Sequence, residues 1–430
     1  MDSKTMEAMD KWATEADGPV ALRLKQTLLP VEESRIIFPP TYADIGYNMD
    51  TLSDGTRVAT VDSVGSQANR LEPIFKSESK DPKHWLVPQI EIVLRKEDCG
   101  ECEACRKNAA QAEGKRAKKD ACMQPREVTR SLLDLEHRAA DAVVLSSPDL
   151  LNLVAPAFKA LRQGNAGPLC TIAPTSLVFG VWNSRGTGEK RPRLVRSIIR
   201  AWDVEPLHAA AQFNSIWKLL NEEQQKELEK AVKDKDKASK LSTAGLKDAP
   251  AIFRKVSTAA AKYMHEFGDG SPNPERRVLG GVLVNTKGRI EREVTVNLVA
   301  LRGLRGADEN ETAAIRKYLL GLSLMAATAD IELFLREGCL LRYAENGDSW
   351  YQVPRRGEPT PVTLNATTAK KYAEEQAEHF RSKWPEKFGK KWTKGHNQLP
   401  ELKYEFNIEE AKKLLAKKSE EEASAGGEAG

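Results

Sequence analysis

The sequence predicts an α+β fold in which helices pack against a sheet and large insertions interrupt the core. Three observations lead to this prediction. Several segments alternate between apolar and polar residues, which is typical of strands with one buried face. Other segments repeat apolar residues every three or four positions, which is typical of amphipathic helices. Two further stretches, one rich in cysteine and one highly charged, do not fit a buried core and are expected to be insertions.

The composition is that of a globular protein. The chain has 430 residues, of which 40% are hydrophobic, enough for two or three domains or for one domain with insertions. Lys and Arg number 66 against 62 Asp and Glu, so the net charge is only +4 and attraction to a polyanion must come from locally segregated charge. The chain starts with a polar, acidic stretch and has no apolar run of membrane-spanning length, so we expect a cytoplasmic protein without membrane contact.

The first strand is expected over residues 19–29. Its apolar residues alternate with Arg23, Lys25 and Thr27, which predicts one buried face and one basic face. A strand with ordinary solvated charges explains the same pattern. Further strands are expected over residues 57–61 and 87–94.

Between these two strands, SVGSQANRLE over residues 63–72 predicts a glycine-hinged loop that runs into a helix. Ser66 is the expected N-cap, and Arg70 lies one turn further on. Free amide groups at a helix start beside a basic residue can form a seat for phosphate. The alternative is an ordinary capped helix whose polar side chains satisfy their own turn.

A cysteine-rich segment then follows over residues 99–129. It has the pattern C-x-x-C-x-x-C and a fourth cysteine after sixteen further residues, which favours a structural zinc site of four thiolates. The less favoured alternatives are an iron-sulfur cluster, whose fourth ligand usually comes from elsewhere, and cysteines that bind no metal. His84 and His137 are substitute ligands, and basic residues around the cysteines could press on a phosphate backbone. The expected ligands are Cys99, Cys102, Cys105 and Cys122.

Helical periodicity over residues 130–144 and 148–163 precedes an apolar strand expected over 169–182. The next loop, NSRGTGEKRPR, is basic and leads into another strand, on which Arg196, Arg200 and Trp202 share one face. Cations beside a flat ring are what single-stranded nucleic acid needs for its phosphates and bases. Packing of Trp202 at a strand end is the alternative.

The second half of the chain returns to the core after a charged helical stretch. A hairpin is expected over residues 277–301 with its turn at 286–288, then a helix with an apolar stripe from Ile315 to Met325, and a last strand over 338–343. Near the C-terminus, four aromatic residues recur at four-residue intervals, which favours packing over base stacking. These residues are Phe380, Trp384, Phe388 and Trp392.

The expected organisation divides the chain into a core and its insertions. No nucleophile motif, Walker loop or metalloprotease motif occurs, and a lone acid such as Asp54 or Asp62 usually forms a turn rather than serving a metal-dependent ribonuclease, so we expect binding and not catalysis. The expected parts are an N-terminal extension (1–18), a core (19–98, 130–212 and 270–345), the cysteine-rich insertion (99–129), a helical insertion (213–269), a C-terminal helical region (346–415) and a disordered tail (416–430).

Four segments resemble a known family: FPPTYAD from Phe38, YNMD from Tyr47, DGTRVATVDSVGSQANRLEPIF from Asp54 and GVWNSRG from Gly180. Together they are similar to the Cas-seven-type backbone subunit, of the RAMP superfamily, in type I-G (formerly I-U) CRISPR interference complexes. The similar segments are scattered between about residues 22 and 343 and leave the cysteine-rich, helical-insertion and C-terminal regions uncovered. The resemblance implies a β-α-β-β-α-β core of the RRM or ferredoxin type, which the strands with one basic face also suit.

The resemblance also implies a function and partners. Copies of the chain would polymerise along CRISPR RNA and present it for pairing with target DNA in antiviral defence. The other partners would be the large subunit, a fused end-cap and processing subunit, and a recruited helicase-nuclease. The alternatives are a RAMP-type ribonuclease that processes guide or target RNA, and a zinc-containing RNA-binding protein outside CRISPR immunity. The expected RNA contacts are Gln67, Asn69 and Arg70 from the matching motif, and Arg23, Lys25, Arg185, Arg196 and Arg200 from the basic strand faces and loop.

Overall fold

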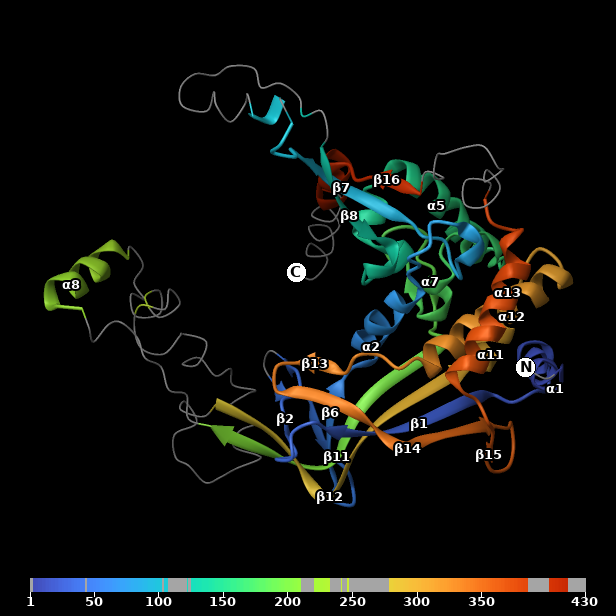
Figure 1. Cartoon of the computed structure of the whole chain (residues 1–430), viewed down its shortest axis with the longest axis horizontal. Coiled ribbons are helices and arrows are strands. Elements are labelled where there is room, and N and C mark those ends of the chain that lie inside the picture. Colours follow the sequence, from blue (N-terminus) through green and yellow to red (C-terminus); the bar gives the residue numbers. More distant parts are fainter. Residues whose placement is uncertain are drawn as a thin grey trace, which may run out of the picture.

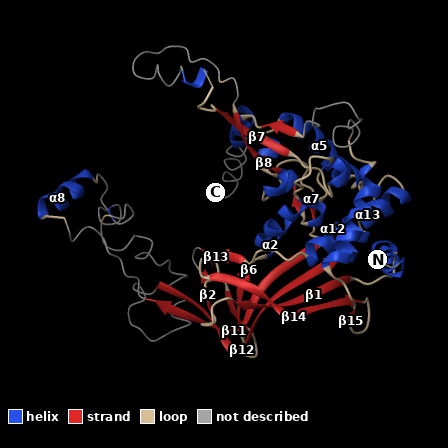
Figure 2. Ribbon diagram, in the orientation of Figure 1, coloured by secondary structure: helices blue, strands red, loops and turns tan. Residues whose placement is uncertain are grey.

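The computed structural model describes residues 3–42, 45–102, 104–106, 122, 125–209, 220–232, 241, 246, 278–385 and 402–416. The predicted α+β fold is confirmed. A large antiparallel sheet carries helices on one of its faces, and a smaller three-stranded sheet lies beyond those helices (Figures 1 and 2). The large sheet has the strand order β13–β14–β1–β12–β11–β6–β5, and two short strands, β2 and β15, pair off this path.

The strands differ widely in length, and the four longest form the centre of the large sheet. Every second residue of β1 from Leu22 to Leu28 is buried, because helices cover only one face, so the alternation predicted for this strand is confirmed. The strands are β1 (Ala21–Pro30), β2 (Ile36–Ile37), β3 (Thr41–Tyr42), β4 (Gly46–Tyr47), β5 (Met49–Thr51), β6 (Arg57–Asp62), β7 (Glu91–Glu97), β8 (Arg126–Ser131), β9 (Val181–Trp182), β10 (Lys190–Arg191), β11 (Val195–Ala209), β12 (Val278–Asn297), β13 (Phe334–Arg336), β14 (Cys339–Val353), β15 (Thr360–Pro361) and β16 (Lys403–Glu405).

The longest described helix, α12, lies across the covered face of the sheet. It starts after Asp308, whose carboxylate accepts a hydrogen bond from the Glu311 amide, and its predicted apolar stripe is buried from Ile315 to Leu322. α1 and α13 pack on α12 from outside (Figure 1). The described helices are α1 (Ser3–Thr14), α2 (Val64–Leu71), α4 (Ala142–Leu145), α5 (Pro148–Arg162), α6 (Gly167–Ile172), α7 (Thr175–Val178), α8 (Glu222–Ala231), α11 (Leu298–Arg302), α12 (Glu309–Thr328) and α13 (Ala366–Arg381), with 3-10 turns η1 (Glu72–Phe75), η2 (Pro82–His84), η3 (Leu132–Asp134) and η4 (Arg138–Ala140).

Two separate hydrophobic clusters stabilise the described core. The larger cluster lies between the helices and the parts of the central strands that the helices cover, and it includes Leu24, Val294 and Tyr318. The smaller cluster lies further along β11 and β12, and it includes Ile199, Val204, Val282 and Ile290. Phe380 and Trp384 are both buried in the larger cluster, so packing is the correct interpretation for these two aromatic residues.

Two secondary-structure expectations for the middle of the chain are wrong. Residues 130–144 form the end of β8, two 3-10 turns and the short α4 rather than one helix. Residues 169–182 form helices α6 and α7 and only the two-residue strand β9, where we expected a strand. Both α6 and α7 are buried almost throughout, and an apolar run that is buried on all sides gives no periodicity that separates helix from strand.

The hairpin expected over residues 277–301 is also wrong. Residues 278–297 form one long strand, β12, that pairs with β11 along both halves, and residues 298–301 belong to α11. Residues 285–288 bulge out of β12 opposite Asp203. Arg35 holds this bulge by donating hydrogen bonds to the carbonyls of Thr286 and Gly288. A Cβ at Gly288 would lie 2.5 Å from the Trp202 carbonyl oxygen, so the sequence that suggested a turn serves a close backbone approach instead.

Several expectations fall on residues outside those that the structure describes. Within the helical insertion, the described helix α8 has no buried residue, as its charge predicts. No described helix has the length and hydropathy needed to cross a bilayer. The expectations that lie outside the described residues concern Lys107, Lys115, Arg116, Lys118, Lys119, Phe388, Trp392, most of the helical insertion and residues 417–430.

Candidate nucleic-acid interface

The helix of the SVGSQANRLE segment, α2, begins one turn earlier than expected. Ser63 is its N-cap: the hydroxyl oxygen accepts a hydrogen bond from the Ser66 amide at 3.3 Å, so the expectation that Ser66 caps the helix is wrong. The Ser63 carbonyl also accepts from the Gln67 amide at 2.8 Å. The cap therefore occupies two of the amides that we expected to be available to a phosphate.

A belt of polar side chains crosses the buried face of the large sheet and ends on α2. Its centre is Arg292 on β12, which is 0% exposed. Arg292 donates to Gln26 Oε1 at 2.6 Å and to Ser197 Oγ at 3.1 Å, and Gln26 in turn donates to Asp348 at 2.9 Å. We call this set the polar belt, and its members are Asp348, Gln26, Arg292, Ser197, Gln67, Asp62 and Arg70.

At the other end, the polar belt fixes α2 to the sheet. Ser197 Oγ donates to Gln67 Oε1 at 2.7 Å, and Gln67 Nε2 donates to Asp62 Oδ2 at 2.7 Å. Arg70 Nε lies 3.2 Å from the same carboxylate, and Arg70 also donates to the Leu335 carbonyl at 2.7 Å. Gln67 is thus enclosed in the protein, where it positions the helix, while the Arg70 side chain remains 29% exposed.

The opposite face of the sheet has no helix among the described residues and carries four of the expected RNA contacts (Figure 2). We call it the open face. Arg23 and Lys25 lie on β1, and Arg196 and Arg200 lie on β11, as the alternation predicts. Arg196 is exposed and Arg200 is half-buried, and within the described ranges neither has a carboxylate partner.

The strand between them, β12, makes the open face less basic than expected. Its register places Glu293 opposite Lys25 and Glu291 opposite Arg200. Lys25 Nζ lies 3.5 Å from Glu291 Oε1. The guanidinium of Arg289 lies 5.0 Å from the Trp202 ring centroid, so a cation already covers the ring that we expected to stack on a base. The open face is therefore a mixed-charge surface.

A more basic site lies beside the β9–β10 hairpin, in the GVWNSRG segment. We call it the hairpin cleft: it has a volume of about 420 Å³ and is lined by residues 136–138, 140, 180–182, 184, 185 and 190–193. Trp182 stands in its wall and is 61% exposed. Lys190 pairs with Trp182 across the hairpin, and its Nζ lies 5.4 Å from the ring centroid.

Two local features hold the hairpin in this shape. Gly180 has a φ of +80°, and a Cβ there would lie 2.8 Å from the Arg193 side chain, so the position requires glycine. The buried Asn183 closes the loop: its amide donates to the Glu189 carbonyl at 2.8 Å, and its carbonyl accepts from the Gly188 amide at 2.9 Å.

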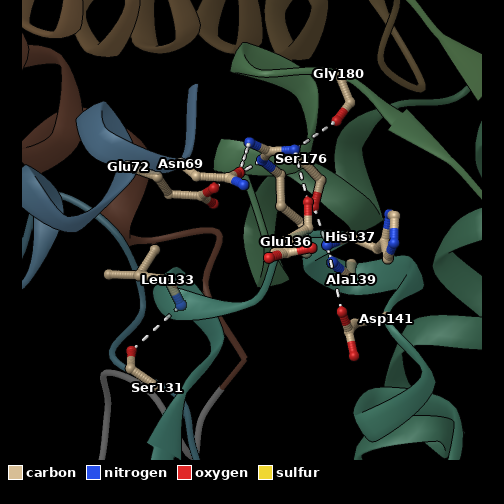
Figure 3. A network of polar contacts seen from close by, with 11 residues as sticks. Asn69, Glu72, Ser131, Leu133, Glu136, His137, Ala139, Asp141, Ser176 and Gly180 are labelled. Atoms are coloured by element: carbon tan, nitrogen blue, oxygen red, sulfur yellow. Dashed lines mark hydrogen bonds and ion pairs between the residues drawn. The ribbon is translucent and has the colours of Figure 1, made fainter. Parts of the chain in front are cut away.

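The base of the hairpin cleft is a buried ion pair that reaches α2. Arg138 is 4% exposed, and its Nε lies 2.7 Å from Glu72 Oε2. The guanidinium also donates to the Gly180 carbonyl and to Asn69 Oδ1, each at 3.4 Å, so Asn69 and Gly180 converge on it from two elements (Figure 3). Burial raises the pKa of Glu72 to about 7, against the opposing attraction of Arg138.

The charges on the rim of the cleft are unequal. Arg185 and Arg193 are exposed, and no described carboxylate pairs with either of them, whereas Arg191 is neutralised by Glu189 at 2.9 Å. Burial lowers the pKa of Arg138, and repulsion from Arg193 adds to that effect despite Glu72. Glu136 is the acidic residue of the lining. The rim is therefore a local concentration of positive charge that an anion would relieve.

The four cysteines of the predicted metal site lie together at the tip of the β7–β8 hairpin, with all their sulfur atoms within 4.8 Å of one another. The Sγ–Sγ distance is 3.9 Å from Cys99 to Cys105, 3.7 Å from Cys102 to Cys122 and 3.5 Å from Cys122 to Cys99. A tetrahedron with metal–sulfur bonds of about 2.3 Å has edges of about 3.8 Å. The sulfurs therefore fit one metal ion, and neither His84 nor His137 belongs to the described cluster.

Residues 22–206 match the family model described as CRISPR-associated protein GSU0053. The match covers less than half of the 430 residues, and over that region the chain is similar to this CRISPR-associated family. The resemblance predicted from the sequence is confirmed at that level. The matched region contains α2, the cysteine cluster, the hairpin cleft and most of β11. No curated protein matches the chain.

The structure thus separates the expected RNA contacts into three places: Gln67 and Arg70 in the polar belt, Asn69 and Arg185 beside or in the hairpin cleft, and the strand arginines and Lys25 on the open face. Sequence reasoning missed Trp182 and Arg138. The signal for Trp182 was present in GVWNSRG, although a single aromatic residue in a two-residue strand has no periodicity. No local pattern announces Arg138, because its partners come from α2 and from Gly180.

Proposed function

We propose that the chain is a CRISPR-associated protein and serves as an RNA-binding backbone subunit of a type I interference complex. The hairpin cleft is the observation that carries the proposal: an exposed tryptophan and two arginines without a carboxylate partner among the described residues meet there, in a segment inside the family match. Cations neutralise phosphates without regard to sequence, and an aromatic ring accepts any base. Such a subunit grips a guide of any sequence and leaves target recognition to base pairing.

The sheet topology supports an RRM-type core for this subunit. Numbered along the chain, β1, β11, β12 and β14 are the first to fourth long strands, and they lie in the order fourth, first, third, second, all antiparallel. α2 lies in the connection before β11 and α12 in the connection before β14, and both pack on the same face. A β-α-β-β-α-β unit has this arrangement, with its other face available to RNA.

Within this proposal the expected RNA contacts take different roles. Arg185 at the cleft and Arg196 and Arg200 on the open face contact phosphates directly, and Arg23 and Lys25 widen that surface. Asn69, Gln67 and Arg70 position the cleft and α2. Copies of the chain repeat this surface along a cytoplasmic guide RNA, beside the large subunit and the fused end-cap and processing subunit, and a helicase-nuclease is recruited to the paired target DNA.

The ribonuclease alternative has little support from the two acids considered for it. The Asp54 carboxylate accepts a hydrogen bond from the Thr56 amide at 2.9 Å within its own turn, which lowers its pKa. Asp62 is 0% exposed and engaged by Gln67 and Arg70 in the polar belt. We therefore propose binding without catalysis.

We also propose that the cysteine cluster holds a single structural zinc ion. Its sulfur atoms lie at the spacing of one tetrahedral ion, whereas a cluster of several irons would separate thiolates that bind different irons. Zinc at this position would fix the tip of the β7–β8 hairpin, beside the exposed Arg106 and Arg126. Elemental analysis of the purified chain tests the identity: about one zinc per chain supports it, and stoichiometric iron with sulfide contradicts it.

Co-purification with guide RNA tests the backbone function. The tagged chain is expressed with a CRISPR array and its partner subunits, and the bound nucleic acid is sized. We expect RNA of one discrete guide length in the wild-type complex and at least ten-fold less in R185E/R193E. The matched control K370E/K371E changes two exposed lysines of α13 and alters the net charge equally, so it should retain the RNA. Full retention by a folded R185E/R193E would contradict the proposal.

A further inference from the structure

Among the described residues, Trp182 is the most exposed aromatic side chain. It stands on a two-residue strand, opposite Lys190, above a cleft whose rim is basic. A tryptophan with 61% of its surface in water adds little to the core, so a ligand is the natural explanation of its position. Lys190 is itself exposed, and its flexible side chain can leave the ring without loss of packing.

The rim next to the ring selects an anion. Arg193 and Arg138 repel each other, and the Arg193 charge has no carboxylate partner in the described ranges. Arg185 lines the same cleft and is also exposed. A phosphate between Arg185 and Arg193 would remove this repulsion and accept charge-assisted hydrogen bonds from both.

The remaining wall orients the ligand. Glu136 is exposed and also lines the cleft, so it repels a phosphate from its own part of the wall and can accept a hydrogen bond from a ribose hydroxyl or a base amino group. The buried Arg138 and Glu72 pair beneath holds this wall at a fixed distance from α2. The cavity of about 420 Å³ is within the range of small-ligand sites.

We propose that the hairpin cleft holds one nucleotide of single-stranded RNA, with its base stacked on Trp182 and its phosphate between Arg185 and Arg193. The inference rests on the proposed function and adds to it one anchoring position per chain and the residues that make it. Each copy of the chain then holds the guide at one stacked base, while the open face contacts only phosphates.

The test compares a labelled oligouridine with an oligomer of the same length whose central residues are abasic, using the full-length chain freed of nucleic acid. Stacking of one base predicts that the wild type binds oligouridine about ten-fold more tightly. W182A should bind both oligomers alike, with the abasic affinity unchanged, and W182F should keep most of the preference. F334A removes an aromatic residue of similar exposure, 55%, outside the cleft and serves as the control.

The arginines have a different signature. R185Q/R193Q should lower the affinity for both oligomers by the same factor. It should also reduce the magnitude of the slope of log affinity against log salt concentration by about two, because two phosphate contacts are lost. Tighter binding of oligodeoxythymidine than of oligouridine would assign the cleft to the target strand and overturn the assignment to RNA.

Persistence of the ten-fold preference in W182A would overturn the stacking proposal, and so would equal binding of the two oligomers by the wild type. Either result leaves the backbone function standing, because that function is judged separately by retention of guide RNA. A wild-type chain that binds neither oligomer would also overturn the nucleotide site, and retention of guide RNA would still decide the backbone function.

Discussion

Replacement of Arg292 by methionine should destabilise the protein by about 3 kcal/mol. The substitution removes a fully buried guanidinium that donates to Gln26 and Ser197, and methionine fills a similar volume, so little cavity forms. Two acceptors left without a donor cost about 1–3 kcal/mol each. The desolvation of the guanidinium, which also lowers the Arg292 pKa, offsets part of this loss because methionine does not incur it.

Chemical denaturation of the full chain measures the effect, and a double-mutant cycle assigns it to the polar belt. Q26L alone should also destabilise, whereas Q26L/R292M should cost at least 1 kcal/mol less than the sum, because the acceptor and donor leave together. Thr295→Met places the same side chain on the open face of β12 and should change stability by less than about 0.5 kcal/mol. A loss below 1 kcal/mol in R292M, or strict additivity in the cycle, would refute the role of the belt.

Three further predictions concern other parts of the chain. Burial raises the pKa of Glu72 from 4.5 to about 7, so the contribution of Glu72 to stability is complete below pH 4.5 and is lost as the pH rises to 7. The loss of unfolding free energy between pH 5 and 7.5, measured with urea, should therefore be about 2 kcal/mol smaller in E72Q than in the wild type. An equal pH dependence in both proteins would contradict this. Cys102→Ser should remove the metal that elemental analysis detects in the wild type. Cys170→Ser, at a buried cysteine outside the cluster, should leave the metal in place. Metal retained by C102S would count against the four-sulfur site. Gly180→Ala should destabilise the protein by about 1–2 kcal/mol, because Gly180 has a positive φ and a Cβ there would contact Arg193. Gly65→Ala, inside α2 with open space around it, should be neutral or stabilising. Equal effects of the two substitutions in thermal unfolding would contradict the argument.

The parts of the fold that the sequence predicted correctly have a clear amphipathic period. β1 buries one face, and its alternation identified it within a few residues. The apolar stripe identified α12, although every residue from Tyr318 to Leu324 is buried. The sequence failed where burial is complete or where a partner is distant. α6 and α7 are buried almost throughout and have no amphipathic period. Residues 285–288 have the sequence of a turn, but Gly288 is there because the backbone of β11 approaches closely.

The candidate site was predictable only in part for the same reason. Alternation placed Arg196 and Arg200 on the correct face, but it could not reveal that the neighbouring strand would bring Glu291 and Glu293 between the basic strands. Charge neutralisation across a sheet depends on strand order, which a single segment does not contain. The cysteine cluster was predicted fully, because its chemistry is encoded in local spacing.

The long pairing of β11 with β12 bears on how the chain tolerates change in length. Ala209 on β11 pairs with Val278 on β12, so the two residues that flank the segment 210–277 lie about 5 Å apart on paired strands. The entropy of closing such a segment grows only with the logarithm of its length. This position therefore acts as a modular attachment point: a shorter or longer sequence inserted there leaves the register of the central strands unchanged, and variants of the protein can differ in this region while keeping the same sheet.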